Sequence, residues 1–205
     1  AGRLVVRRVF LSARASATMI KLFSVRDKQK KDEAAAEANG TKANKLSAGE
    51  LRIQKDMVEL NLPSNMSIHF PGGKEKLMHF EITIRPDEGI YKGGQFLFDF
   101  KISQGYPHDA PKVLCMTKVY HPNIDLEGKI CLNILREDWK PVLSISSVIF
   151  GLQFLFLDPN PEDPLNKEAA VAFQENPRRF EGDVQRAIQY GHIINGVHFP
   201  PCRAT

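Results

Sequence analysis

The stretch GGQFLFDFKIS, residues 93–103, has the most regular pattern of the 205-residue chain. Its phenylalanines fall on every second position, at Phe96, Phe98 and Phe100, and the intervening positions are Leu97, Asp99 and Lys101. Successive side chains of a β-strand point to opposite faces of a sheet. The alternation therefore predicts a strand with one buried, aromatic face.

Other strand-like runs lie on both sides of this stretch. MSIHF (66–70) and LMHFEITIRP (77–86) precede it and are separated by the turn PGGKEK (71–76). PKVLCMT (111–117) follows it as a short fourth strand. Runs of this length bounded by turn residues predict an antiparallel meander of four strands.

A helix is predicted ahead of the strands, within residues 47–63. Ser47 and Glu50, three residues later, form a capping box, and Pro63 follows the helix. The apolar positions form a broad stripe that comprises Leu51, Ile53, Met57, Val58, Leu60 and Leu62.

Helical patterns return in the second half of the chain. ISSVIFGLQFLFL (145–157) is apolar nearly all round and predicts a buried central helix. DPNPEDP (158–164) has three prolines and predicts a rigid loop, and two more helices are predicted within 165–176 and 177–191. This order of elements predicts an α+β domain with segregated layers.

Composition divides the chain into four parts. Residues 1–18 are rich in arginine and lack acids, which suits either an organellar transit peptide or additional upstream sequence. Residues 19–46 predict a flexible N-terminal arm, residues 47–192 a folded domain, and residues 193–205 a C-terminal tail. The net charge is +4. Residues 1–18 contribute +4, residues 19–46 contribute +3, and residues 47–205 contribute −3. The folded part is thus not basic, which argues against nucleic acid as a partner.

The three cysteines are Cys115, Cys131 and Cys202. Their odd number and wide spacing predict neither a disulfide framework nor a metal site and favour a reducing compartment. Cys115 is predicted in the core and Cys202 in the tail. No apolar run reaches the roughly 18 residues that a membrane span requires, so no membrane contact is expected.

Cys131 lies in HPNIDLEGKICLNIL (121–135), eight residues after Asn123. A buried structural thiol is the simplest interpretation. A thiol protease that pairs Cys131 with His121 is another, but His121 lies on a turn locked by Pro122, and no residue that would orient its ring is evident.

Five separated landmarks resemble the ubiquitin-conjugating enzymes over about residues 47–192. They are the His-Pro-Asn triplet, Cys131, Trp139 eight residues later, YPHDAPKV (106–113) and DPNPEDPL (158–165). MIKLF (19–23) with its charged arm, PDEGIYKGGQF (86–96) and CLNILREDWKPVL (131–143) are most similar to the branch that conjugates the Nedd/Rub-type modifier. Residues 1–18 depart from that pattern, and Asn133 stands where many relatives carry Asp or Ser.

The resemblance implies an acyltransferase. Cys131 would accept the modifier's carboxyl group as a thioester from a heterodimeric activating enzyme, and a substrate lysine would then attack it with the help of a RING-type ligase. Cullins are the implied substrates. The implied enzyme is a monomer that binds no cofactor or metal, since ATP is used by the activating enzyme. Its expected location is cytoplasmic and nuclear, or organellar if residues 1–18 are a transit peptide.

The resemblance also assigns roles around Cys131. The amide of Asn123 would stabilise the oxyanion, an effect of roughly 10²–10³ in rate, or would instead close the loop through its own hydrogen bonds. Asp163, 32 residues after Cys131, matches the family's acid that orients the lysine, or is an ordinary loop acid, and its neighbour Glu162 could share the orienting role. His121 and Pro122 would support the active-site loop, and Asn133 would shape the groove for the modifier's tail.

Two further sets of residues are implied as partner contacts. The activating enzyme would capture a docking peptide formed by Met19, Ile20, Leu22 and Phe23. The ligase would meet two loops that contain Tyr106, Pro107, Pro111, Trp139 and Pro141.

Two alternatives keep the same fold. One is an ordinary ubiquitin-conjugating enzyme, against which the N-terminal arm argues. The other is an inactive scaffold that only binds modifiers, against which Cys131 argues because such scaffolds lack the nucleophile.

Overall fold

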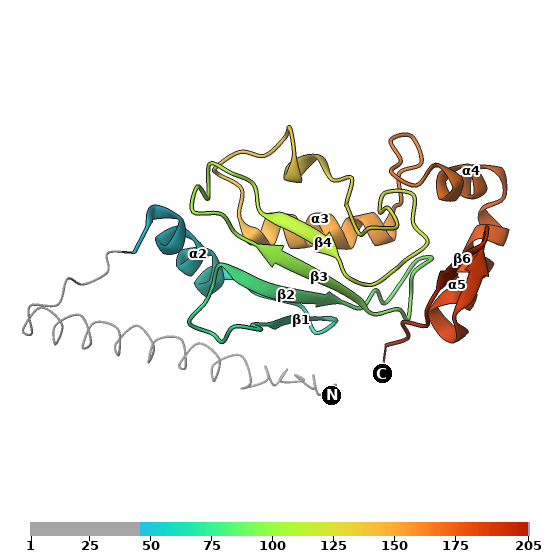
Figure 1. Ribbon diagram of the computed structural model, residues 1–205, viewed down its shortest axis with the longest axis horizontal. Coiled ribbons are helices and arrows are strands. Elements are labelled where there is room, and N and C mark those ends of the chain that lie inside the picture. The colour runs from blue at the N-terminus through green and yellow to red at the C-terminus, as the bar shows by residue number, and fades with distance from the viewer. Residues whose placement is uncertain (1–45, 205) are drawn as a thin grey trace, which may run out of the picture. The chain divides into compact units, whose positions relative to one another are not determined.

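The computed structural model describes residues 46–204, and Figure 1 shows the arrangement of their helices and strands. The elements in order are α2 (Ala48–Glu59), β1 (Met66–His69), β2 (His79–Ile84), β3 (Phe96–Lys101), β4 (Lys112–Cys115), the short 3₁₀ helix η1 (Asn133–Leu135), α3 (Ile145–Leu157), α4 (Lys167–Glu175), α5 (Pro177–Tyr190), β5 (His192–Ile194) and β6 (Val197–Phe199). The predicted order of one helix, four strands, an irregular segment and three helices is confirmed. The predicted docking peptide and residues 1–18 lie outside the described residues.

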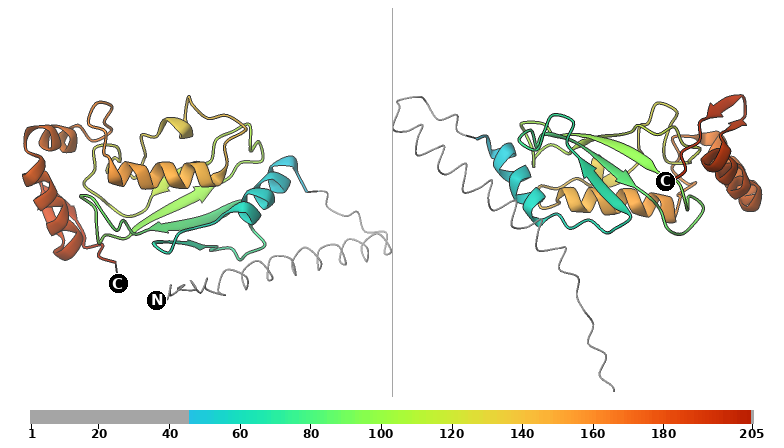
Figure 2. Two further views of the ribbon diagram at one scale, coloured as in Figure 1. Left: turned by 180° about the vertical axis from the view of Figure 1, so that it is seen from behind. Right: turned by 90° about the horizontal axis from the view of Figure 1, so that it is seen from below.

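The four long strands form one antiparallel sheet in the order β1-β2-β3-β4. The register of β2 and β3 sets Phe80 opposite Phe100 and Ile82 opposite Phe98. All four side chains are fully buried. The strand alternation of the sequence therefore places a continuous apolar layer on one face of the sheet. Helix α3 lies across this sheet, while α2 lies at one end of it and α4 and α5 lie at the other (Figures 1 and 2).

Helix α2 begins as predicted, because Ser47 and Glu50 form both hydrogen bonds of a capping box. Ile53 and Met57, four residues apart, turn into the core. Leu51 and Val58, however, are 55% and 61% exposed, so the predicted broad stripe is wrong for these two positions. Only a narrow face of the helix meets the rest of the fold.

Helix α3 has the predicted bounds, but it is not buried all round. Val148, Leu152 and Phe156 are fully buried, whereas Phe150 and Phe154 are 52% and 59% exposed. Nothing in the described residues covers this second face, which explains the difference from the prediction of a fully buried helix.

Residues 193–205, predicted as a tail, contain most of a β-hairpin formed by β5 and β6. Its two-residue turn is Asn195-Gly196, and both residues have the positive φ angles that such turns require. The chain then pairs with the start of β3, where the N–H of Gln95 donates to the carbonyl of Cys202 at 2.7 Å. Cys202 is half-buried against the core rather than lying in a free tail. No helix within residues 46–204 has the length and apolar character needed to cross a membrane.

A buried carboxylate ties α2 to two other segments. Asp56 is 3% exposed and accepts hydrogen bonds from Arg52 (2.9 Å), from the Tyr106 hydroxyl and from the N–H of Ile145 (3.3 Å) at the start of α3. Arg52 lies one helical turn from Asp56, but Tyr106 and Ile145 come from distant parts of the chain, so no local pattern predicts the contacts that join them.

Replacement of Asp56 should reveal the cost of leaving these partners unpaired. We expect Asp56→Ala to lower the free energy of unfolding by about 3 kcal/mol. The variant leaves the half-buried Arg52 cation, the Tyr106 hydroxyl and the Ile145 N–H without their acceptor. Urea unfolding of the full chain measures this change. Glu59→Ala is the matched control, since Glu59 is exposed and faces only Lys55 at 3.9 Å, and it should cost less than about 0.5 kcal/mol. Equal losses in the two variants would contradict this assignment.

Candidate active site

His121 fixes the turn before the cysteine and is fully buried. Its Nδ1 accepts the backbone N–H of Asn123 at 2.9 Å, so Nε2 carries the proton and donates to the carbonyl of Leu155 at 2.9 Å. The ring also stacks on Tyr91, with centroids 4.9 Å apart. Burial lowers the pKa of His121 to about 4. A neutral histidine with both nitrogens engaged supports the loop and is not available to Cys131 as a base.

A second turn brings the chain from Asn123 back to Cys131. Asp125 accepts two backbone N–H groups within this turn, at 2.8 and 3.0 Å. Gly128 has φ of 84°, and a Cβ there would collide with the carbonyl of Cys115. The N–H of Cys131 then donates to the carbonyl of Asn123 at 2.8 Å. The backbone of the cysteine is thus held directly by Asn123.

The side chain of Asn123 is buried and joins Cys131 to the loop of residues 158–164. Its Oδ1 accepts the N–H of Asn160 at 2.8 Å. Its Nδ2 donates to the carbonyls of Asn160 at 2.7 Å and of Asp163 at 3.3 Å. Both amide hydrogens are therefore occupied in this structure. This geometry supports the alternative in which Asn123 closes the loop through its own hydrogen bonds. The Asn123 amide could donate to an oxyanion only if one of its two bonds to the loop opened.

The structure brings Asp163 beside Cys131. Cys131 is 8% exposed, and its Sγ donates to the Asp163 carboxylate, with 3.2 Å between Sγ and Oδ2. Burial raises the pKa of the Cys131 thiol, and the hydrogen bond and negative charge of Asp163 raise it further, while Arg136 opposes them. The thiol is consequently held in its protonated form, and no neighbouring base draws its proton away.

The remaining predicted loop residues surround this centre. The carbonyl of Pro122 accepts the N–H of Asn166, the N-cap of α4, at 2.9 Å. Asn133 is exposed at the start of η1, and its carbonyl accepts the N–H of Arg136 at 2.9 Å. Its side chain therefore faces solvent two residues beyond Cys131.

The two predicted ligase-facing loops touch each other. The indole N–H of Trp139 donates to the carbonyl of Pro107 at 2.8 Å, and its ring lies 5.9 Å from that of Tyr106. Tyr106 and Pro111 are buried, whereas Pro107 and Trp139 are half-buried. Within these loops, Tyr106 and Pro111 therefore serve as framework and not as exposed contacts.

The tip of the second loop is its most accessible part. Pro141 is exposed and Val142 is 83% exposed. Arg52 of α2 holds the tip by donating to the carbonyls of Pro141 at 2.7 Å and Leu143 at 2.6 Å. Sequence reasoning missed Val142, because a single valine between loop residues carries no periodic signal.

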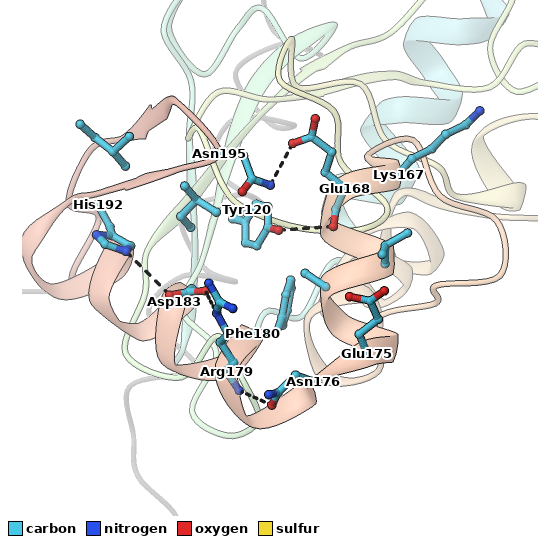
Figure 3. A pocket seen from close by; sticks show the side chains of 14 residues that line it. Tyr120, Lys167, Glu168, Glu175, Asn176, Arg179, Phe180, Asp183, His192 and Asn195 are labelled. Carbon is cyan, nitrogen blue, oxygen red and sulfur yellow. Dashed lines mark hydrogen bonds and ion pairs between the residues drawn. The ribbon is translucent and has the colours of Figure 1, made fainter.

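Neither hollow described in the structure contains the thiol. A cavity of about 540 Å³ lies between α4, α5 and β5, with Tyr120 and Phe180 among its lining residues (Figure 3). A smaller one of about 140 Å³ lies beside Cys115 and Gly128. Cys131 is instead nearly buried beside the exposed residue Asp163 of the 158–164 loop. No group of three His, Cys, Asp or Glu side chains in residues 46–204 is placed to hold a metal ion.

Residues 52–188 match the family model described as ubiquitin-conjugating enzyme. The chain is 56% identical over 184 residues to the NEDD8-conjugating enzyme Ubc12 of Arabidopsis thaliana, which covers 90% of this chain and all of the relative. It is 54% identical over 184 residues to the Nedd8-conjugating enzyme UbcE2M of Drosophila melanogaster, with 90% and 98% covered. The solved structure of S. cerevisiae Ubc12 superposes with a TM-score of 0.73 at 38% identity, covering 89% of this chain and 100% of that one.

The buried His121 predicts a pH dependence of folding. The unfolded chain takes up a proton at this residue near pH 6.5, whereas the folded state does so only near pH 4. The unfolded state therefore binds more protons between these values, and stability falls as the pH decreases through this window. In His121→Asn this loss is absent, so the stability gap between wild type and variant should narrow by about 2 kcal/mol between pH 7.5 and pH 4.5. Urea unfolding at the two pH values checks this, and an unchanged gap would show that His121 is not held neutral.

The Asp163 contact predicts a change in thiol reactivity. Asp163→Asn removes the charge that raises the pKa of Cys131, so the rate of alkylation by iodoacetamide should rise at lower pH than in wild type. Mass spectrometry of the peptide that contains Cys131 follows this rate. Glu162→Gln, a neighbouring exposed acid, is the control and should leave the profile in place. If the pH profile of Cys131 alkylation were the same in Asp163→Asn as in wild type, Asp163 would have no influence on the thiol.

Proposed function

The chain belongs to the ubiquitin-conjugating enzyme family, and we propose that it carries a NEDD8-type modifier as a thioester on Cys131 and transfers it to lysine side chains. The observation that carries the chemistry is the Cys131 thiol, which lies 3.2 Å from the Asp163 carboxylate. The choice of modifier is supported by the NEDD8-conjugating relatives at 56% and 54% identity.

The first step is a thioester exchange. The Cys131 thiol loses its proton to solvent, and the thiolate attacks the carbonyl carbon of the modifier's thioester on the activating enzyme. A new C–S bond forms, and the old one breaks as the other thiolate departs. Because one thioester replaces another of similar energy, a raised thiol pKa and the engagement of both His121 nitrogens elsewhere are compatible with this step.

The second step joins the modifier to a lysine. The neutral amine attacks the thioester carbon, an amide bond forms, and the Cys131 thiolate leaves. An unperturbed lysine has a pKa of about 10.4, so the amine must be deprotonated and oriented at the site. The carboxylate of Asp163, beside the sulfur, is positioned to accept a hydrogen bond from the amine. Asn123 supports this step by holding the loop that carries Asp163.

The partners follow from the same proposal. The heterodimeric activating enzyme consumes ATP, charges Cys131 and engages the docking peptide of residues 19–23, so this chain needs no cofactor of its own. A RING-type ligase meets the loop tip formed by Pro141 and Val142, and cullins provide the lysines. Cys115, Cys131 and Cys202 are all free thiols, which fits a reducing location such as the cytoplasm and nucleus.

A charging assay tests the proposal. We expect the full chain, mixed with ATP, NEDD8-activating enzyme and NEDD8, to form an adduct that a thiol reductant removes. Cys131→Ala should form none, and Cys131→Ser should form an ester that resists the reductant. Cys202→Ala is the control and should charge like the wild type.

Ubiquitin and its own activating enzyme form the comparison arm. An adduct with ubiquitin alone would keep the mechanism and refute the choice of modifier. An adduct with neither, repeated on a chain that begins at Met19, would indicate a scaffold without activity.

A further inference from the structure

We propose that Asn160 is a positioning residue for lysine attack, because its side chain builds the turn that sets Asp163 beside Cys131. The inference rests on the proposed function and assigns a task to a residue that sequence reasoning missed. Asn160 lies between two prolines of the 158–164 loop and is exposed.

The side chain of Asn160 closes a local turn. Its Oδ1 accepts the backbone N–H of Glu162, two residues on, at 2.9 Å. This is the hydrogen bond by which an asparagine side chain imitates a backbone turn. Pro161, in the middle of the turn, has no N–H to offer and a restricted φ. The turn therefore depends on the Asn160 side chain and leads directly into Asp163.

The backbone of Asn160 is fixed independently. Its N–H and carbonyl both pair with the Asn123 amide, at 2.8 and 2.7 Å. Asn123 also holds the N–H of Cys131 at 2.8 Å. Cys131, Asn123, Asn160 and Asp163 thus form a closed ring of contacts that ends at the bond between Sγ and Oδ2 of 3.2 Å.

Within this ring the turn is the part that Asn160 alone controls. The anchor from Asn123 to the Asp163 carbonyl is long, at 3.3 Å, and fixes the backbone rather than the carboxylate. Loss of the Asn160 side chain leaves the bonds from Asn123 to the Asn160 backbone and the Asp163 carbonyl intact. It removes the bond to the N–H of Glu162, which sets the conformation of the chain leading into Asp163. The carboxylate would then no longer be held against the sulfur, while the nucleophile itself would stay in place.

Single-turnover discharge of the charged enzyme onto free lysine tests this proposal. We expect Asn160→Ala to be charged at the wild-type rate and to discharge about 10-fold more slowly. Asn160→Ser keeps an oxygen that can form the same turn more weakly and should recover most of the rate. Because Asn160 acts through Asp163, the double variant Asn160→Ala/Asp163→Ala should be no slower than Asp163→Ala alone.

Three results would overturn the proposal: multiplied losses in the double variant, an unchanged discharge rate in Asn160→Ala, or a loss of charging in that variant.

A second readout needs no modifier, and so separates this inference from the proposed function. The charged groups that act on the Cys131 thiol are Asp163, Arg136 and Glu137. If the turn positions Asp163, Asn160→Ala should shift the pH profile of Cys131 alkylation in the same direction as Asp163→Asn, and an unshifted profile would refute it.

Discussion

The side-chain amide of Asn123 is the contact on which the geometry of the site rests. It pairs with the backbone of Asn160 in both directions and donates to the carbonyl of Asp163, while the backbone carbonyl of Asn123 accepts the N–H of Cys131. One buried residue thereby fixes the nucleophile and the loop that carries the acid. His121 supports Asn123 in turn, because its Nδ1 accepts the N–H of that residue and its Nε2 is tied to α3.

This arrangement suits acyl transfer between proteins. Burial and the neighbouring Asp163 raise the pKa of the thiol, so it is not a strongly activated nucleophile of the kind that hydrolyses peptides. A thioester stores the reactivity that such an enzyme needs, and the incoming amine is the group that requires help. The acid beside the sulfur is held there by its loop, and in the proposed mechanism it is the group that orients that amine.

Local patterns in the sequence predicted most of the fold. The alternation of Phe96, Phe98 and Phe100 predicted β3, and Ser47 predicted the start of α2. The exposure of individual side chains was harder to predict. Leu51 and Phe154 are apolar but exposed, because no other element of the described residues packs against their side of the helix, and the sequence pattern of a helix does not report this. The β5–β6 hairpin was missed although its Asn195-Gly196 turn is a recognised signal.

The centre of the site was predicted only in part. Cys131 and Asp163 were found through the family resemblance, but the partner of Asn123 lies 37 residues further along the chain, and no local pattern reports such a contact. The buried bond between Asp56 and Tyr106 was missed for the same reason, with 50 residues between the two.

The most direct measurement compares two attackers on the charged enzyme in wild type and Asn123→Ala. Both a small thiol and lysine generate an oxyanion at the thioester, but in the proposed mechanism only the amine uses the acid on the loop. If Asn123 acts by holding that loop, the variant will slow lysine attack strongly and leave exchange with the thiol nearly unchanged. Equal slowing of both reactions would show instead that the Asn123 amide stabilises the oxyanion itself.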